Sequence, residues 1–172
     1  MQRYAEAFSF LQSKNLYTVD DLDNALHAMQ DKIDALKKSA SAQQSRIKEL
    51  DGLLRMVDYY KSSKPAADKL KSIRFEKSRQ KYKSEHDNEL RTFYMAERKL
   101  KPYFKDGKLP ITAWRKERTQ LEQEYKDIQT ELSPLRADAK KLWAIHYNIY
   151  EVQHDQERQN TELRQKKQEI EH

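Results

Sequence analysis

Apolar residues recur at alternating spacings of four and three residues between Leu22 and Val57. This heptad pattern predicts a long helix that carries one apolar seam. Thr18 is placed to cap the start of the helix, and Asp21 would lie near the positive end of its dipole. Pro65 disfavours helical geometry at the residue before it, so we expect this first long helix to span residues 19–64. The seam positions are Leu22, Leu26, Met29, Ile33, Leu36, Ala40, Gln43, Ile47, Leu50, Leu54 and Val57.

A second seam with the same spacing lies in the last third of the chain. It predicts a second long helix over residues 110–152. Pro134 falls inside this seam, and the register continues through it unchanged. We therefore expect either a continuous helix that is kinked at Pro134 or a break at Ser133. The seam positions are Leu121, Tyr125, Ile128, Leu132, Leu135, Ala139, Leu142, His146 and Ile149.

Two seams of similar length on one chain predict an elongated antiparallel coiled-coil hairpin of the all-α class. Leu22 would then lie near Ile149, and Val57 near Leu121. Residues 65–105 would form a helical tip, and Gly107 and Pro110 would supply the turn into the second long helix. The tip has a looser apolar stripe, made of Phe75, Tyr82, Leu90, Phe93, Leu100 and Phe104.

The two ends of the chain complete one predicted helical domain over residues 1–172. A short helix over residues 1–14 is expected to pack through Tyr4, Phe8 and Leu11 against Trp143, Tyr147 and Tyr150. Residues 153–172 lose the seam and predict a polar helical tail. The pattern leaves open whether the seams pair within one chain or between two chains as a homodimer. Gln43 either sets the register of the pairing or marks its loosest point.

The composition agrees with a helical chain. Two glycines and four prolines leave little turn chemistry for a β-rich fold, and 36% of the residues are charged. The chain has no cysteine, which is typical of a reducing compartment. No apolar run approaches the roughly 20 residues needed to cross a bilayer, and the N-terminus has no signal-peptide organisation. We expect a cytoplasmic protein without membrane insertion.

The positive charge is concentrated in one stretch. Residues 59–83 hold nine Lys or Arg residues and two acidic residues, a net charge of +7, whereas the whole chain has +6. Such a stretch is either the solvated face of a helix or a surface for an anion such as DNA. The scarcity of acidic residues and the rings of Phe75 and Tyr82 favour the second interpretation. The candidate phosphate contacts are Lys61, Lys64, Lys69, Lys71, Arg74, Lys77, Arg79, Lys81 and Lys83.

The residues that carry most catalytic and metal chemistry are scattered. The five histidines form no H-x-H or H-E-x-x-H motif, and there is no Gly-rich phosphate loop. The pair Glu151 and His154 and the pair Glu169 and His172 match the E-x-x-H of helical di-iron sites. Those sites need the motifs on different facing helices, whereas both pairs lie on the same polar tail. We therefore predict no catalytic residue, no metal site and no cofactor.

Three segments together resemble a known family. "KYKSEHDNELRTFYMAERKLK" has an aromatic-x-x-x-His-x-x-Glu-Leu pattern at Tyr82, His86, Glu89 and Leu90, and "KLPITAWRKE" begins at Lys108. With "FLQSKNLYTVDDLDNAL" at residues 10–26, they resemble the C-terminal helical region of the relaxases (mobilisation nucleases) of Gram-positive conjugative and mobilisable elements. The resemblance covers nearly the whole chain.

The resemblance implies a plasmid or transposon protein that acts in conjugation and mobilisation. In that family an N-terminal nuclease domain nicks DNA with a catalytic tyrosine and a histidine-bound metal. This chain has no such histidine cluster, so the resemblance implies a relaxase segment without the nuclease, and none of its ten tyrosines is the nicking residue.

The sequence thus predicts a non-catalytic accessory domain that binds the DNA backbone or docks the nicking complex to proteins of the transfer machinery. The alternative is a coiled-coil module for protein–protein interaction or self-association without nucleic-acid binding.

Overall fold

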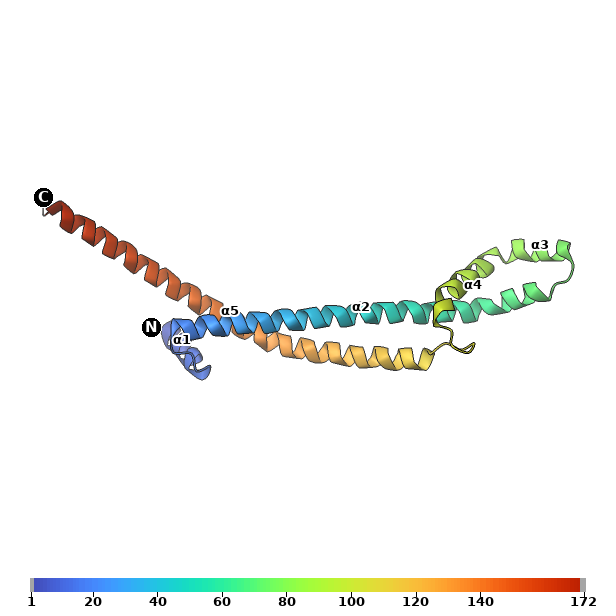
Figure 1. The fold of residues 1–172 in the computed structure, drawn as a ribbon, viewed down its shortest axis with the longest axis horizontal. Helices are drawn as coiled ribbons and strands as arrows, with labels where there is room; N and C mark the ends of the chain where they lie inside the picture. The colour runs from blue at the N-terminus through green and yellow to red at the C-terminus, as the bar shows by residue number, and fades with distance from the viewer. Residues whose placement is uncertain (1, 171–172) are drawn as a thin grey trace. The chain divides into compact units, whose positions relative to one another are not determined.

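Two long helices make up most of the fold, and shorter helices lie before and between them in the chain. A computed structural model describes residues 2–170, with the side chains of residues 5–165 (Figure 1). No β-strand is formed within these residues, so the predicted all-α class is confirmed. The elements in chain order are α1 (Gln2–Ser13), α2 (Val19–Ser72), α3 (Glu76–Glu85), α4 (Asp87–Leu100), the 3-10 helix η1 (Lys101–Tyr103) and α5 (Ile111–Ile170).

The apolar seams form the contact between the two long helices. Every seam position named above, on α2 and on α5, is buried or half-buried. The seams therefore pack within one chain, and a homodimer through them is not supported. The contacts of the chain group into two compact units. Unit 1 comprises residues 1–39 and 128–172, and unit 2 comprises residues 40–127.

In unit 1 the first part of α2 runs antiparallel to the second part of α5. Leu22, Leu26 and Leu142 are almost fully buried in one cluster, and Ile149 packs against it, as predicted for Leu22 and Ile149. A second cluster holds Ile33, Leu132 and Ala139. Polar contacts join the helices beside the seam, with 2.8 Å between Asp23 Oδ1 and His146 Nε2 and an ion pair of 2.6 Å between Lys32 Nζ and Glu131 Oε1.

Helix α1 packs within unit 1 through Leu11, as predicted, but its partners on α5 differ from those predicted. Phe10, Leu11 and Leu16 contact the Leu22 cluster together with Ile145 and Ile149. The predicted partners are exposed instead, to 49% for Trp143, 62% for Tyr147 and 56% for Tyr150, and Phe8 is also exposed. Ile145 and Ile149 each follow an aromatic residue by two positions, which is roughly 200° around a helix. The isoleucines therefore face α1 and the aromatic rings face away, while the side chain of Tyr4 lies outside the described residues.

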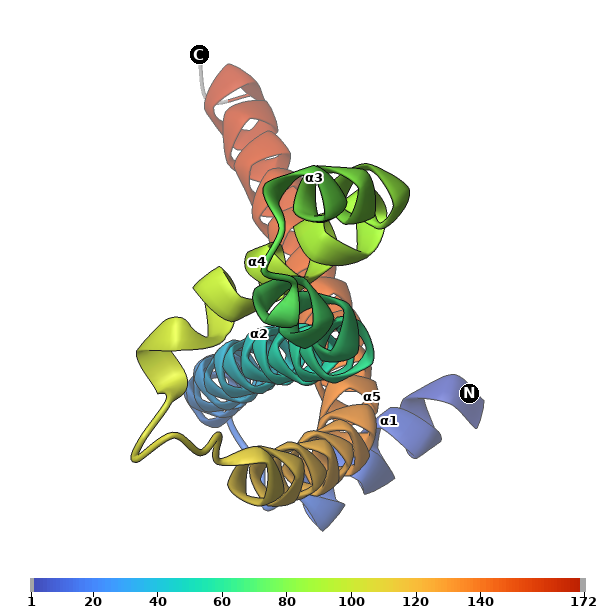
Figure 2. The ribbon, with the colours of Figure 1, turned by 90° about the vertical axis from the view of Figure 1, so that its right-hand side faces the viewer.

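In unit 2 helix α2 packs against two different neighbours. Figure 2 shows α2 between the α3–α4 pair and the first part of α5. One cluster joins α2 to α5 and to the end of α4, and it brings Leu121 near Val57, as predicted. The other cluster joins α2 to α3 and α4. The buried members of the first are Leu50, Leu53, Val57, Leu100 and Trp114, and those of the second are Ala66, Ala67, Leu70, Tyr82, Leu90 and Phe93.

Polar contacts fix the register of the hairpin in unit 2. The guanidinium of Arg46 donates two hydrogen bonds to Glu117, from Nε to Oε1 at 2.7 Å and from Nη2 to Oε2 at 3.2 Å. This bidentate contact lowers the pKa of Glu117. Gln43, the polar seam residue, donates from Nε2 to Glu124 Oε2 at 3.0 Å. Its Oε1 is buried without a partner, so the seam accommodates Gln43 at a cost.

The predicted end of the first long helix at residue 64 is wrong, because α2 continues through Pro65 to Ser72. Proline removes one helical hydrogen bond and costs about 3 kcal/mol or more in a helix interior. The next helical turns bury Ala66, Ala67 and Leu70 against α3 and α4, and this packing offsets the local cost. Helix α5 likewise runs through Pro134, so there is no break at Ser133. It also continues into the predicted polar tail, where the described side chains of residues 153–165 are all exposed.

The turn before α5 forms as the sequence predicts. Asp106 and Gly107 both have positive φ, 49° and 72°, and the backbones of Lys105 and Lys108 exchange hydrogen bonds of 2.9 Å. An Asp-Gly pair with positive φ at both positions is the favoured two-residue turn. It leads through Pro110 to α5, which begins at Ile111.

A reciprocal capping arrangement starts α2, as predicted for Thr18 and Asp21. The Asp21 backbone N–H donates to Thr18 Oγ1, and the Thr18 backbone N–H donates to Asp21 Oδ2, both at 3.0 Å. The Tyr17 N–H also donates to Asp21 Oδ2 at 3.2 Å. The hydrogen bonds from Thr18, and then that from Tyr17, hold the pKa of Asp21 below its ordinary value of 3.8.

This cap predicts a pH-dependent contribution to stability. Because the folded pKa of Asp21 is depressed, its contribution is complete above pH 3.8 and is lost as the pH falls through the lower folded value. Asp21→Asn should lower the thermal midpoint at neutral pH, and the difference from wild type should shrink in acid. Asp31→Asn removes the same charge from an exposed site of α2 and serves as the control. A deficit of Asp21→Asn that stays constant with pH would contradict the assignment.

Candidate nucleic-acid interface

The nine predicted phosphate contacts all lie in unit 2, on two consecutive helices and the segment between them. Four are on α2, Arg74 is in the connection, and four are on α3. Leu70 of α2 and Tyr82 of α3 share one buried cluster, so the two groups are brought onto neighbouring helices. Arg79 is half-buried and the other eight residues are exposed.

The two units of the chain differ in net charge. Unit 2 has 22 Lys or Arg residues and 14 Asp or Glu residues, a net charge of +8. Unit 1 has 12 and 14, a net charge of −2. A polyanion would therefore be attracted to unit 2 specifically.

The nine cations differ in how free their charged groups are. Among the described residues, Lys61, Arg74, Lys77 and Lys83 have no ion pair, whereas Lys81 lies 3.8 Å from Glu85 of its own helix. The four unpaired cations keep their full charge available to a phosphate without breaking an existing contact.

Three other lysines lie over aromatic rings. The Nζ atoms of Lys64, Lys69 and Lys71 are 5.8, 5.4 and 5.9 Å from the ring centroids of Tyr60, Tyr82 and Phe93. Their stems cover apolar surface while the ammonium groups stay exposed. These three residues thus serve packing as well as charge.

Arg79 is half-buried on α3, and the residues of the resemblance pattern serve mainly to join α3 to α4. The Nε of Arg79 is buried and has no hydrogen-bond partner. Tyr82 and Leu90 are buried, and the rings of Tyr82 and His86 are 4.2 Å apart. His86 Nδ1 lies 3.4 Å from Glu89 but is not in hydrogen-bond geometry. The aromatic-x-x-x-His-x-x-Glu-Leu pattern therefore has a packing role here.

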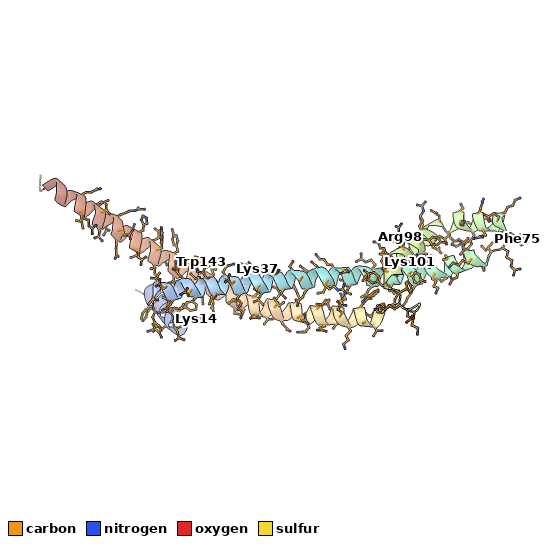
Figure 3. The ribbon with its side chains drawn as sticks, in the orientation of Figure 1. Lys14, Lys37, Phe75, Arg98, Lys101 and Trp143 are labelled. Carbon is orange, nitrogen blue, oxygen red and sulfur yellow. The ribbon has the colours of Figure 1, made fainter. Side chains whose placement is uncertain are left out.

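Phe75 does not belong to the apolar stripe that the sequence predicted. It lies at the turn between α2 and α3, in extended backbone directly before α3, and is 78% exposed (Figure 3). The α2–α3 contact uses Tyr82 and Leu70 instead, because α3 begins only after Phe75. The exposed ring stands between the exposed cations Arg74 and Lys77 in the sequence, where a stacking surface would be useful to a nucleic acid.

A second basic group lies outside the stretch at residues 59–83 and was not predicted. It follows α4 through η1 to the two-residue turn and contains Arg98, Lys99, Lys101, Lys105 and Lys108, all exposed. The stretch "RKLKPYFKDGK" at residues 98–108 has five basic residues and one acidic residue, a signal that the longer run at residues 59–83 overshadowed. Beside it the surface is hollowed and lined by Tyr60, Tyr94, Glu97, Arg98, Lys101 and Phe104.

The described part of the chain contains no group of three or more metal-ligating side chains. Glu151 and His154 are both exposed on α5, while the side chain of Glu169 and the whole of His172 lie outside the described residues. Within the same part of the chain, no helix is long and apolar enough to cross a membrane.

Comparison with protein-family models, curated proteins and solved structures finds no match to the chain. The relaxase resemblance stays a prediction.

The opposite exposure of two phenylalanines in unit 2 can be checked by stability. Phe93 is 2% exposed, so Phe93→Ala should lower the free energy of unfolding by about 3–5 kcal/mol. Phe75→Ala should change it by less than about 0.5 kcal/mol because the ring contacts little else. Denaturant titration of both variants measures the difference. Comparable losses would mean that Phe75 packs against the helices after all.

Proposed function

We propose that this chain is a non-catalytic accessory domain of a conjugative relaxase that holds DNA by its phosphate backbone. The observation that carries the proposal is the concentration of charge in unit 2, with a net charge of +8, and the presence there of exposed cations without acidic partners. The relaxase context rests on the resemblance of the three sequence segments. The DNA-binding role rests on the charge and exposure of named side chains.

The chemistry of these cations favours backbone contacts over base recognition. Lysine ammonium groups on flexible stems act as point charges toward phosphate and carry little sequence information. The exposed, unpaired residues Lys61, Lys77 and Lys83 have no fixed geometry that would select one base edge. Binding would therefore be largely independent of sequence and would weaken strongly with salt. Such a domain would retain DNA near the nicking site without choosing the site.

Charge reversal at these three lysines tests the proposal. Wild-type protein should bind a short DNA duplex at about 50 mM salt, with a logarithmic salt slope near −4 if about four phosphates are contacted. The variant Lys61→Glu/Lys77→Glu/Lys83→Glu should bind more weakly, with a salt slope smaller in magnitude by about three. Fluorescence anisotropy across a salt series measures both.

A matched control separates local contacts from net charge. Lys38, Arg136 and Lys140 are exposed and belong to unit 1, so their reversal to Glu changes the total charge by the same amount. This control should keep most of the affinity and the wild-type slope. Absence of binding by wild-type protein at low salt, or equal losses in the two triple variants, would refute the proposal.

A second candidate function is self-association through unit 1. Trp143, Tyr147 and Tyr150 follow each other at spacings of four and three on α5, and their rings are 49–62% exposed. Because the seams are occupied within the chain, this aromatic stripe is one exposed apolar surface that a second copy could contact. A contiguous exposed apolar patch is typical of an interaction site.

Sedimentation velocity tests this second candidate. If the stripe associates, the wild-type protein should show a concentration-dependent dimer, and Trp143→Ala/Tyr147→Ala should be monomeric because two of the three rings are removed. Tyr17→Ala removes a ring that is 71% exposed but lies outside the stripe, and it should leave the dimer intact. A monomer at all concentrations would leave DNA binding as the only proposed role.

A further inference from the structure

The hollow beside the second basic group has the composition of a site for a planar, negatively charged ligand. Its volume of about 690 Å³ is in the range of ligand clefts. Three aromatic rings line it, from Tyr60, Tyr94 and Phe104, and the cations Arg98 and Lys101 line it as well. All of these residues belong to unit 2, which carries the excess positive charge.

The rings of this hollow are held by their neighbours. Tyr60 stacks on Phe93 with 5.2 Å between ring centroids, and Phe104 meets Tyr60 edge-on at 6.0 Å. Tyr94 meets the buried ring of Phe93 edge-on at 5.4 Å and is still 48% exposed. A ring that is fixed by packing and open to solvent stacks with a ligand at a small cost in conformational entropy.

The cations are placed to contact the phosphates of a nucleic-acid strand whose base reaches these rings. Arg98 on the last turn of α4 and Lys101 at the start of η1 are three residues apart and exposed (Figure 3). Neither has an ion pair among the described residues. Lys64, from the basic stretch at residues 59–83, lies over Tyr60 with its Nζ 5.8 Å from the ring centroid. The hollow therefore adjoins the proposed phosphate-binding surface.

Glu97 gives the hollow a carboxylate among these cations. A carboxylate repels phosphate but accepts hydrogen bonds from the exocyclic amino groups of bases, as acidic side chains do with cytosine N4. Thymine has no such amino group. The combination of rings, cations and a carboxylate suits a base with an amino group and its neighbouring phosphates.

We infer that this hollow receives an unstacked base of single-stranded DNA, which stacks on Tyr94 while Arg98 and Lys101 contact the adjoining phosphates. The inference rests on the proposed function and names its substrate class, a single strand in preference to a duplex. In a duplex the bases are paired and stacked, so a base would have to leave the stack at a cost of a few kcal/mol. A strand that is already unpaired avoids this cost.

The test compares a cytosine single strand with a duplex of the same length, using the intact chain. Wild-type protein should bind the single strand more tightly. Tyr94→Ala should weaken single-strand binding by about 5- to 150-fold, the loss expected for one base–aromatic stack, and leave duplex binding unchanged. Tyr94→Phe keeps the ring and should retain the preference, while Tyr17→Ala serves as the control for removal of an exposed tyrosine.

Two further arms identify the ligand. A cytosine mononucleotide should compete poorly, because it offers one phosphate where the strand offers two. If the mononucleotide competes as strongly as the single strand does, the assignment of single-stranded DNA as the ligand is wrong. A thymine strand should bind more weakly than the cytosine strand, and Glu97→Ala should reduce that difference. Equal binding of both strands to wild-type protein would overturn the role of Glu97.

The failures of this inference and of the proposed function are distinguishable. If wild-type protein binds single strand and duplex equally, or if Tyr94→Ala weakens both to the same extent or neither, the stacking site is wrong while backbone binding stands. If wild-type protein binds neither nucleic acid at low salt, the proposed function itself is wrong and the inference falls with it.

Discussion

Burial of the α2 seam is the constraint on which the rest of the structure depends. Only 37% of the residues are hydrophobic, which is too few to fill a broad core. One apolar stripe along each long helix is enough to pair the two helices. Leu22, Leu50 and Leu142 are at most 1% exposed, and a fully buried leucine contributes about 1.5–3 kcal/mol. Because the seams remove most aliphatic side chains from the surface, the remaining faces of the helices are polar and available for charge.

In unit 2 the same helix serves two packing partners. The turns of α2 that contain Leu50 and Val57 pack against α5 and the end of α4, and the turns that contain Ala66 and Leu70 pack against α3 and α4. The small alanines let α3 and α4 approach α2 closely, and the basic side chains are left on the outer faces. The localisation of charge is thus a consequence of which faces the packing occupies.

The elements that the sequence predicts well are those specified by local, periodic signals. The seam positions, the cap at Thr18 and the Asp106–Gly107 turn each depend on residues close together in the chain. The continuation of α2 through Pro65 was not predictable in this way, because its stabilising partners, Tyr82 and Phe93, lie well downstream.

The candidate site was predicted only in part for the same reason. Charge is visible in the sequence, so the cations of residues 59–83 were identified. The exposure of Phe75 depends on where α3 begins, which the apolar stripe alone does not specify. The hollow depends on Tyr60, Tyr94 and Phe104, which meet only after the chain has reversed direction.

Tyr60 links the two hydrophobic clusters of unit 2. Its ring packs against both hydrophobic clusters of unit 2 and also lines the hollow. A ligand that restricts this ring would stabilise the native arrangement of both clusters. By thermodynamic reciprocity, any change that loosens either cluster would lower the affinity for that ligand. Ligand affinity and the resistance of unit 2 to local opening are therefore one coupled property, with a single tyrosine ring as the link.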